Sequence, residues 1–361
     1  MKIRLAHLST LLFLVLIDFG CSKNPSPAAA GAPNETATTS VVQPAPSGAE
    51  PLTSWNNGTA KHAIIDFVKT TTDKNNPKFV PPEDRIATFD QDGTLWVEQP
   101  LYSQLVFSYD RLKSIAPQHP EWSRDPLFKG LIVGDLKAVM KSTGNYVDAI
   151  DKATQISMPV DEFASLVKAW MATAKHVRFD RPYPQMVYQP MLEVMKYLRD
   201  NGYRTYIVTG GGQQFVRTYS QQVYGIPPEQ VIGSAVKTEL QYNKDGQAFL
   251  MREKSILLDN NHAGKAEDIF LFLGRHPKAA FGNSTGDQQM LEYTQSGAGA
   301  ALEMLVLHDD AKREYAYGPA NGLPATKIGT FSQPLYDEAK RNGWTVISMK
   351  DDWKRVFAWE N

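Results

Sequence analysis

The sequence predicts an α/β fold, a three-layer α/β/α sandwich around a parallel sheet, with a mostly helical segment inserted after the first strand. In the second half of the 361-residue chain, short apolar β-prone runs alternate with amphipathic helical stretches. This alternation is typical of a parallel sheet covered by helices on both faces. Between the first strand and this alternation, residues 97–185 have apolar spacing of the helical period.

The individual helices and strands are predicted from the local spacing of apolar residues. The first helix is predicted around Ala63–Val68, where apolar residues recur at helical spacing. Apolar β-prone runs predict strands at 85–89, 203–208, 231–236, 279–282, 300–307 and 345–349, with a hairpin at 240–251. Later helices are predicted at 191–199, from about 213, at 265–273 and at 287–293.

The N-terminus predicts export. Residues 1–20 combine a short basic stretch with an apolar run that is too short to span a bilayer, which is typical of a signal peptide. Cys21 follows a glycine and resembles the lipidated cysteine of bacterial lipoproteins, although Asp18 departs from that pattern. Residues 21–54 are rich in Pro, Ala, Ser and Thr and predict a flexible tether. We therefore expect a periplasmic or cell-envelope protein whose membrane contact is a lipid anchor.

Composition excludes some partners and leaves others open. The formal net charge is −1, and no basic stripe interleaved with aromatic residues is present, so nucleic-acid binding is not expected. Near-neutrality leaves an anionic substrate possible. The oligomeric state stays open.

Four polar motifs fall at predicted strand ends or helix starts. Asp90 and Asp92, in Phe-Asp-Gln-Asp-Gly-Thr, follow the first strand, and Thr209 with three glycines ends the second. Lys265 begins a helix, and the loop Gly-Asn-Ser-Thr-Gly-Asp, residues 282–287, follows a later strand. Carboxylates gathered at the carboxyl end of a parallel sheet favour a metal-assisted site.

This set of motifs resembles the haloacid dehalogenase superfamily, in particular phosphoserine-phosphatase-like enzymes with a helical cap. The resemblance implies a Rossmann-like core at 55–96 and 186–361, and a cap at about 97–185. It implies a Mg²⁺-dependent phosphatase that acts on a small phosphorylated substrate.

The resemblance also implies roles for individual residues. Asp90 would be the nucleophile and Asp92 the acid/base. Substrate phosphate would be bound by Thr209, Gly210 and Lys265. The residues expected around Mg²⁺ are Asp90, Asp92, Asn283 and Asp287.

Some alternatives stay open. Lys237 and Lys254 compete with Lys265 for the role of motif lysine. Asn283 stands where the family has an aspartate, which is expected to lower Mg²⁺ affinity. It also favours a second hypothesis, a catalytically degenerate protein that binds a phosphorylated ligand. Trp96 and Tyr102 are expected either to line the entrance of the site or to pack in the core.

Overall fold

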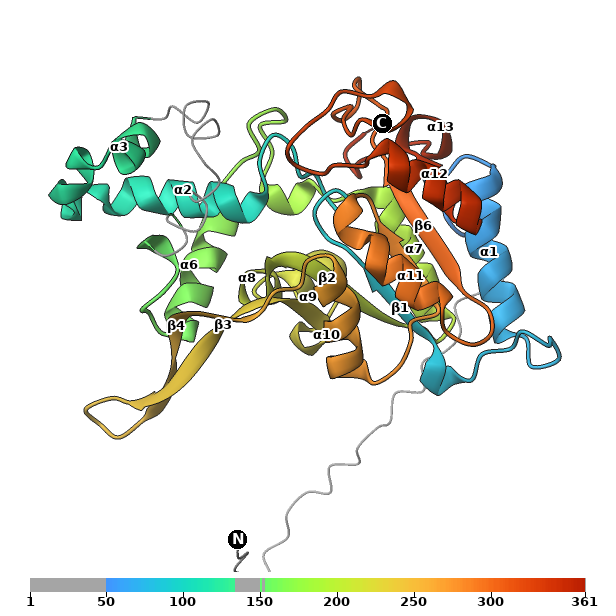
Figure 1. The fold of residues 1–361 in the computed structure, drawn as a ribbon, viewed down its shortest axis with the longest axis horizontal. Coiled ribbons are helices and arrows are strands. Elements are labelled where there is room, and N and C mark those ends of the chain that lie inside the picture. The colour runs from blue at the N-terminus through green and yellow to red at the C-terminus, as the bar shows by residue number, and fades with distance from the viewer. Residues whose placement is uncertain (1–49, 134–149, 151–152, 361) are drawn as a thin grey trace, which may run out of the picture. The chain divides into compact units, whose positions relative to one another are not determined.

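The computed structural model describes residues 50–133, 150 and 153–360. In this part of the chain, seven strands form one sheet in the order β4-β3-β2-β1-β5-β6-β7 (Figure 1). The strands are β1 (Ile86–Phe89), β2 (Arg204–Gly212), β3 (Val231–Tyr242), β4 (Ala248–Leu258), β5 (Ala279–Gly282), β6 (Leu302–Leu307) and β7 (Thr345–Ser348). Every pairing is parallel except that of β3 with the edge strand β4. The predicted parallel sheet is confirmed, with one antiparallel strand at its edge.

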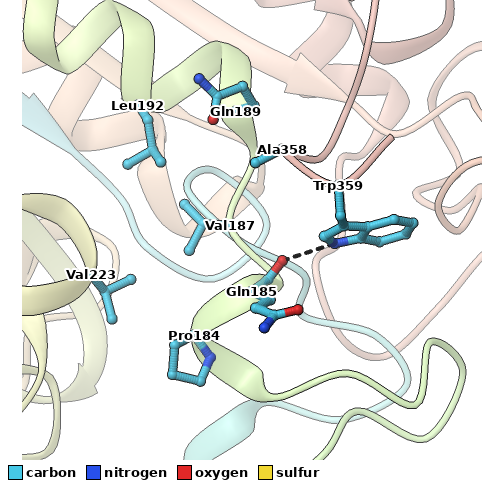
Figure 2. Close-up of a pocket in the computed structure, with 8 residues that line it drawn as sticks. All are labelled: Pro184, Gln185, Val187, Gln189, Leu192, Val223, Ala358 and Trp359. Atoms are coloured by element: carbon cyan, nitrogen blue, oxygen red, sulfur yellow. Dashed lines mark hydrogen bonds between the residues drawn. The ribbon is translucent and has the colours of Figure 1, made fainter. Parts of the chain in front are cut away.

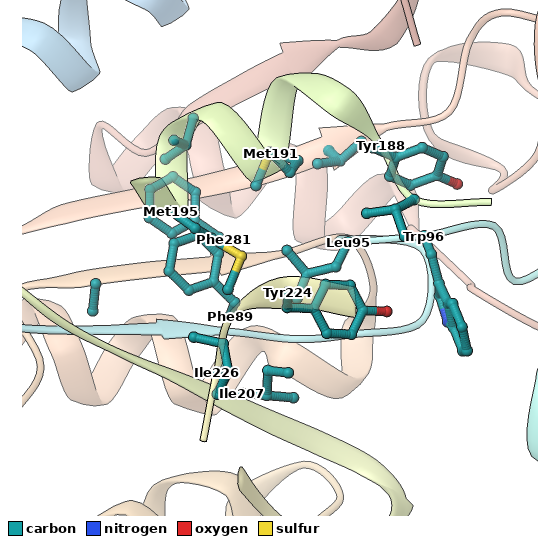
Figure 3. Packing of buried hydrophobic residues seen from close by; sticks show 14 of the residues in the cluster. Phe89, Leu95, Trp96, Tyr188, Met191, Met195, Ile207, Tyr224, Ile226 and Phe281 are labelled. Atoms are coloured by element: carbon teal, nitrogen blue, oxygen red, sulfur yellow. The ribbon is translucent and has the colours of Figure 1, made fainter. Parts of the chain in front are cut away.

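Alternate residues of the buried strands face opposite sides of the sheet, which produces three layers. Phe89, Phe281 and Ile207 pack with side chains of α7 in one core cluster (Figure 3). Ile86 and Val208 belong to a second cluster with residues of α10, α11 and α12. The helices of these layers are α1 (Thr59–Thr72), α7 (Gln189–Asp200), α8 (Gln213–Arg217), α9 (Ser220–Tyr224), α10 (Ala263–Leu273), α11 (Gln288–Gln295), α12 (Gln333–Asn342) and α13 (Met349–Asp352).

The segment between β1 and α7 contains three α-helices among its described residues. It contains α2 (Ser103–Ile115), α3 (Pro126–Ile132) and α6 (Val160–Thr173). Its two ends meet, because Val97 N donates to Met186 O at 3.1 Å. Leu105 and Leu112 of α2 pack with Leu131 in a small cluster of their own. This geometry suits an insertion that leaves and re-enters the core at one place, and its role as a separate cap stays a prediction.

Two strand predictions needed correction. β2 continues past Val208 to Gly212, because the chain shifts register between Thr209 and Gly212 and pairs again with Ser234 of β3. The predicted strand at 231–236 and the following hairpin are in fact one long pair, β3 and β4, whose exposed outer half lacks the burial that marks a core strand.

The predicted N-terminal tether extends too far at its carboxyl end. Leu52 is buried, and Ser54 N and Oγ donate to the Glu193 carboxylate of α7 at 2.8 and 2.7 Å. The polar composition of this stretch did not reveal these contacts. The signal peptide, Cys21 and the tether up to residue 49 lie outside the described residues. Within the described part, no helix is long and apolar enough to cross a membrane.

Candidate active site

The first motif lies where β1 ends beside β5. Asp90 N donates to Phe281 O at 2.9 Å, and the rings of Phe89 and Phe281 stack with centroids 4.5 Å apart. The stacked rings hold the two strand ends together, and a polar residue follows each strand, Asp90 after β1 and Asn283 after β5. Parallel pairing brings the carboxyl ends of β1, β2 and β5 to this same edge.

One lysine joins two of the predicted motifs. Lys265 Nζ donates to Asp90 Oδ1 at 2.5 Å and to Asp287 Oδ1 at 2.6 Å. It also donates to Val208 O of β2 at 2.9 Å. Lys265 is 3% exposed, whereas Lys237 and Lys254 on the hairpin are exposed. Of the three candidate lysines, Lys265 is therefore the one that contacts the motif residues Asp90 and Asp287.

Asp287 contacts both Lys265 and the backbone of its own loop. Its Oδ1 is held by Lys265, and its Oδ2 accepts from the backbone N–H groups of Asn283 and Ser284 at 2.9 and 3.0 Å. The loop forms a capping box in which Ser284 Oγ accepts from Gly286 N. Both oxygens of the Asp287 carboxylate therefore make contacts within the protein, and its expected role as a metal ligand stays a prediction.

Asp92 is held by an indole. Trp96 Nε1 donates to Asp92 Oδ1 at 2.6 Å, and Trp96 is fully buried. The expectation that Trp96 lines the entrance is wrong, because its ring stacks on Tyr219 in the core, with centroids 5.2 Å apart. Tyr102, at 36% exposure, stays near the surface.

Side-chain atoms of Thr209, Asp92 and Gln104 all lie near Gly211 of the second motif. A methyl group added at Gly211 would lie 3.2 Å from Thr209 Oγ1, 3.9 Å from Asp92 Oδ2 and 3.7 Å from Gln104 Oε1. Gly211 N donates to Thr209 Oγ1 at 3.0 Å. Gln104 of α2 reaches the same place and accepts from Gly212 N at 2.7 Å. The inserted segment therefore contributes Gln104, which the sequence reasoning missed, to the glycine-rich part of the second motif.

The two aspartates of the first motif have raised pKa values. Burial, reinforced by the charge of Asp287 and opposed by Lys265, raises the pKa of Asp90 to about 7. Burial raises the pKa of Asp92 to about 6, against the hydrogen bond from Trp96. For Lys265, burial favours the neutral form, but the charges of Asp287 and Asp90 outweigh it and raise the pKa to about 12. Asp92 thus titrates near neutrality, as a group that both gives and takes a proton should.

The raised pKa of Asp92 predicts a pH-dependent stability in metal-free protein. An unfolded chain ionises this carboxyl near pH 3.8, whereas the folded state keeps the proton until about pH 6. The folded state binds more protons in that window, so the contribution of Asp92 to stability falls as pH rises. Relative to wild type, Asp92→Asn should gain stability between pH 4 and pH 6, by up to about 2 kcal/mol after allowance for partial exposure. Urea unfolding across pH measures the difference, and a constant difference would contradict the prediction.

A second group of residues supports the motifs and was also missed by sequence reasoning. Asn283 Nδ2 donates to Glu98 Oε1 at 2.7 Å, and Tyr317 OH donates to the same oxygen at 2.8 Å. The side chain of His308 contacts Gly93 O through Nε2 at 2.7 Å and Glu314 through Nδ1 at 3.1 Å. Glu98, Tyr317 and His308 stand outside the four motifs, so only their burial in the folded chain identifies them.

The donors at this edge fit a hard divalent cation by chemistry and charge. Lys265 Nζ contacts Asp90 and Asp287, and the charges of Asp90 and Asp92 act on the buried carboxyl group of Glu98. Burial is the main cause of the raised pKa values of Asp90 and Asp92, and a bound cation would favour their ionised forms. Across the described residues, no three His, Cys, Asp or Glu side chains are grouped to hold a metal ion. A cation here would depend on a mixed oxygen set that includes the amide of Asn283.

A cavity elsewhere on the core has no part in this arrangement. Its volume is about 390 Å³, and Figure 2 shows its lining. The lining residues are Pro184, Gln185, Val187, Gln189, Leu192, Val223, Ala358 and Trp359, and none belongs to the motifs. We assign it no function.

Comparison with known proteins gives one family and several solved structures. The model of the haloacid dehalogenase-like hydrolases matches residues 87–292. A conserved protein of unknown function from Anaerococcus prevotii is 15% identical with a TM-score of 0.46, over 69% of this chain and 85% of that one. A protein of unknown function from Bordetella pertussis is 16% identical with a TM-score of 0.44, over 73% and 97%. A phosphoserine phosphohydrolase-like protein from Francisella tularensis is 17% identical with a TM-score of 0.33, over 62% and 88%. The comparison with curated proteins gave no match.

Proposed function

This chain belongs to the haloacid dehalogenase-like hydrolases, and we propose that it is a Mg²⁺-dependent phosphatase that hydrolyses a small phosphomonoester through an aspartyl-phosphate intermediate. The observation that carries the proposal is the bridge of Lys265 Nζ between Asp90 at 2.5 Å and Asp287 at 2.6 Å. This bridge supports the proposal because it holds the buried Asp90 carboxylate beside the ammonium group of Lys265. The carboxyl group of Asp92 follows two residues further along the chain.

The residues of the site divide the reaction into two steps. Asp90 attacks phosphorus, an oxygen–phosphorus bond forms, and the bond to the leaving oxygen breaks while Asp92 gives that oxygen its proton. Asp92 then takes a proton from water, whose oxygen attacks phosphorus. The bond to Asp90 breaks, and inorganic phosphate leaves. Both tasks of Asp92 suit a carboxyl group whose pKa is about 6.

The other residues bind and shield charge. Lys265 neutralises Asp90 and a phosphoryl oxygen, and Thr209 with the backbone N–H of Gly210 donates to the remaining oxygens. Asp90, the backbone carbonyl of Asp92 and the Asn283 amide oxygen would hold Mg²⁺, which would shield the nucleophile from the substrate's negative charge. Asp287 holds Lys265 in place and stays among the residues expected around the cation.

An assay with p-nitrophenyl phosphate tests the proposal against its rival. We expect turnover that is lost with EDTA and restored by Mg²⁺. The rival, a degenerate protein that binds a phosphorylated ligand, is favoured by the neutral Asn283 where an acid would strengthen metal binding. Ligand-dependent stabilisation without metal-dependent turnover would support that rival and sink the enzyme proposal.

We also propose that the protein is exported and anchored by lipid at Cys21. The expected mature protein begins at Cys21 and carries a lipid on its thiol, which intact mass spectrometry of membrane-extracted protein measures. Cys21→Ala serves as the control and should release the protein from the membrane fraction. An unmodified N-terminus beyond residue 21 would rule out the anchor.

A further inference from the structure

The amide of Asn283 is fixed at both of its atoms. Its Oδ1 accepts from Thr94 Oγ1 at 3.2 Å, and its Nδ2 donates to Glu98 Oε1 at 2.7 Å. The side chain is buried at 1% exposure. Exchange of the two amide atoms would set the amide oxygen against the Glu98 oxygen that already accepts from Tyr317. Glu98 therefore fixes the orientation of the Asn283 amide, with its nitrogen toward Glu98 and its oxygen toward Thr94.

Glu98 occupies a cradle built from three separated parts of the chain. It follows β1, its partner Asn283 follows β5, and its second partner Tyr317 follows β6. Glu98 is 2% exposed. Two glycines leave room for it: an added Cβ would lie 2.3 Å from Glu98 Oε1 at Gly93, where φ is +79°, and 1.9 Å at Gly329, where φ is +65°. Any side chain at either position would collide with this carboxyl group as well as strain the backbone.

The contact between Asn283 and Glu98 would affect how well the amide of Asn283 binds a cation. An amide oxygen is a weaker ligand for Mg²⁺ than a carboxylate, and its oxygen and nitrogen ends are nearly equal in shape. An acceptor bound to the N–H₂ group fixes the orientation and draws more negative charge onto the oxygen. The amide oxygen keeps a second lone pair beside its bond from Thr94.

We propose that Glu98 is a positioning residue that acts through Asn283, orienting and polarising its amide oxygen toward the cation. The inference rests on the proposed use of Mg²⁺ by this site. Tyr317 holds Glu98 in turn, so a segment beyond the matched residues 87–292 supports the metal site.

The test is Mg²⁺ affinity of EDTA-stripped full-length protein by calorimetric titration, with the Mg²⁺-dependent rise in unfolding temperature as a second readout. Glu98→Leu removes the acceptor and should weaken Mg²⁺ binding about 10- to 100-fold, the usual effect of losing an outer-shell partner. Glu98→Gln keeps an acceptor oxygen and should stay within about threefold of wild type. Glu303→Leu is the matched control, because Glu303 is a buried glutamate of β6 whose Oε1 has no partner.

A double-mutant cycle separates positioning from general stability. If Glu98 acts through Asn283, Glu98→Leu should not weaken Mg²⁺ binding further in an Asn283→Ala background. Equal weakening in both backgrounds, or an unchanged affinity in Glu98→Leu, would overturn the proposal. Should Glu98→Leu fail to fold, Tyr317→Phe removes only the hydroxyl that holds Glu98 and should weaken binding in the same direction; an unchanged affinity would again overturn it. Absence of Mg²⁺ binding in wild type would instead refute the proposed function on which the inference rests.

Discussion

Asp90→Asn is expected to abolish phosphatase activity, by at least about 10⁴-fold in kcat, because an amide in place of the attacking carboxylate removes the nucleophile. The fold should survive. Lys265 keeps Asp287 and Val208 O as partners, and the Asn side chain retains an acceptor oxygen. Hydrolysis of p-nitrophenyl phosphate at saturating Mg²⁺ measures the loss.

Stability provides the control for this variant. Burial raises the pKa of Asp90 to about 7, so the ionised carboxyl costs the metal-free protein stability above that pH. Asp90→Asn should therefore be at least as stable as wild type at pH 8 in EDTA while it is inactive. Asp66→Asn, at an exposed position of α1, is the matched variant and should keep full activity. Residual turnover of Asp90→Asn near the wild-type rate would remove Asp90 from the mechanism.

Lys265→Met is expected to have the largest effect on stability. It leaves Asp90 and Asp287 without their shared cation in a buried place. Removing one partner of a buried ion pair costs about 3–5 kcal/mol. We expect a loss of this size in the free energy of unfolding at pH 8, measured by urea denaturation, together with loss of activity.

The pH dependence and a control sharpen this expectation. At pH 5, Asp90 is protonated in the folded state because its pKa is about 7, so part of the destabilisation should disappear. The exposed rival Lys254→Met should change stability by less than about 0.5 kcal/mol. An equal effect of the two substitutions would show that Lys265 does not have the buried role described here.

Local sequence patterns predicted most of the strands and helices and the residues at the centre of the site. Strand ends such as Phe89 and helix starts such as Lys265 are marked by short-range sequence, and parallel pairing then brings them to one edge. The sequence alone left three lysines open, because Lys237, Lys254 and Lys265 differ in burial, which depends on the finished fold.

The parts that sequence did not predict are long-range contacts. Glu98 meets Asn283 across 185 positions and Tyr317 across 219, and neither spacing produces a local pattern. For Trp96 the alternative of packing in the core is confirmed, and only its hydrogen bond to the Asp92 carboxylate was not predicted. The contact of Asp287 with Lys265 was not predicted for the same reason, since it depends on how α10 meets the loop after β5.

The central claim is that the phosphoryl group of the substrate is transferred to Asp90. The Asp92→Asn variant allows this aspartyl-phosphate to be measured directly. The p-nitrophenolate group leaves without a proton, so the first step should proceed in this variant, whereas activation of water in the second step should slow by about 10²- to 10⁴-fold. Asp92→Asn protein is incubated with p-nitrophenyl phosphate and Mg²⁺ and then quenched with acid. It should carry one phosphoryl group, which peptide mass spectrometry maps to Asp90. The double variant with Asp92→Asn and Asp90→Asn should carry none. A phosphoryl group on another residue would contradict the account. So would the absence of any phosphoryl group on Asp92→Asn protein when the wild-type protein hydrolyses the substrate measurably.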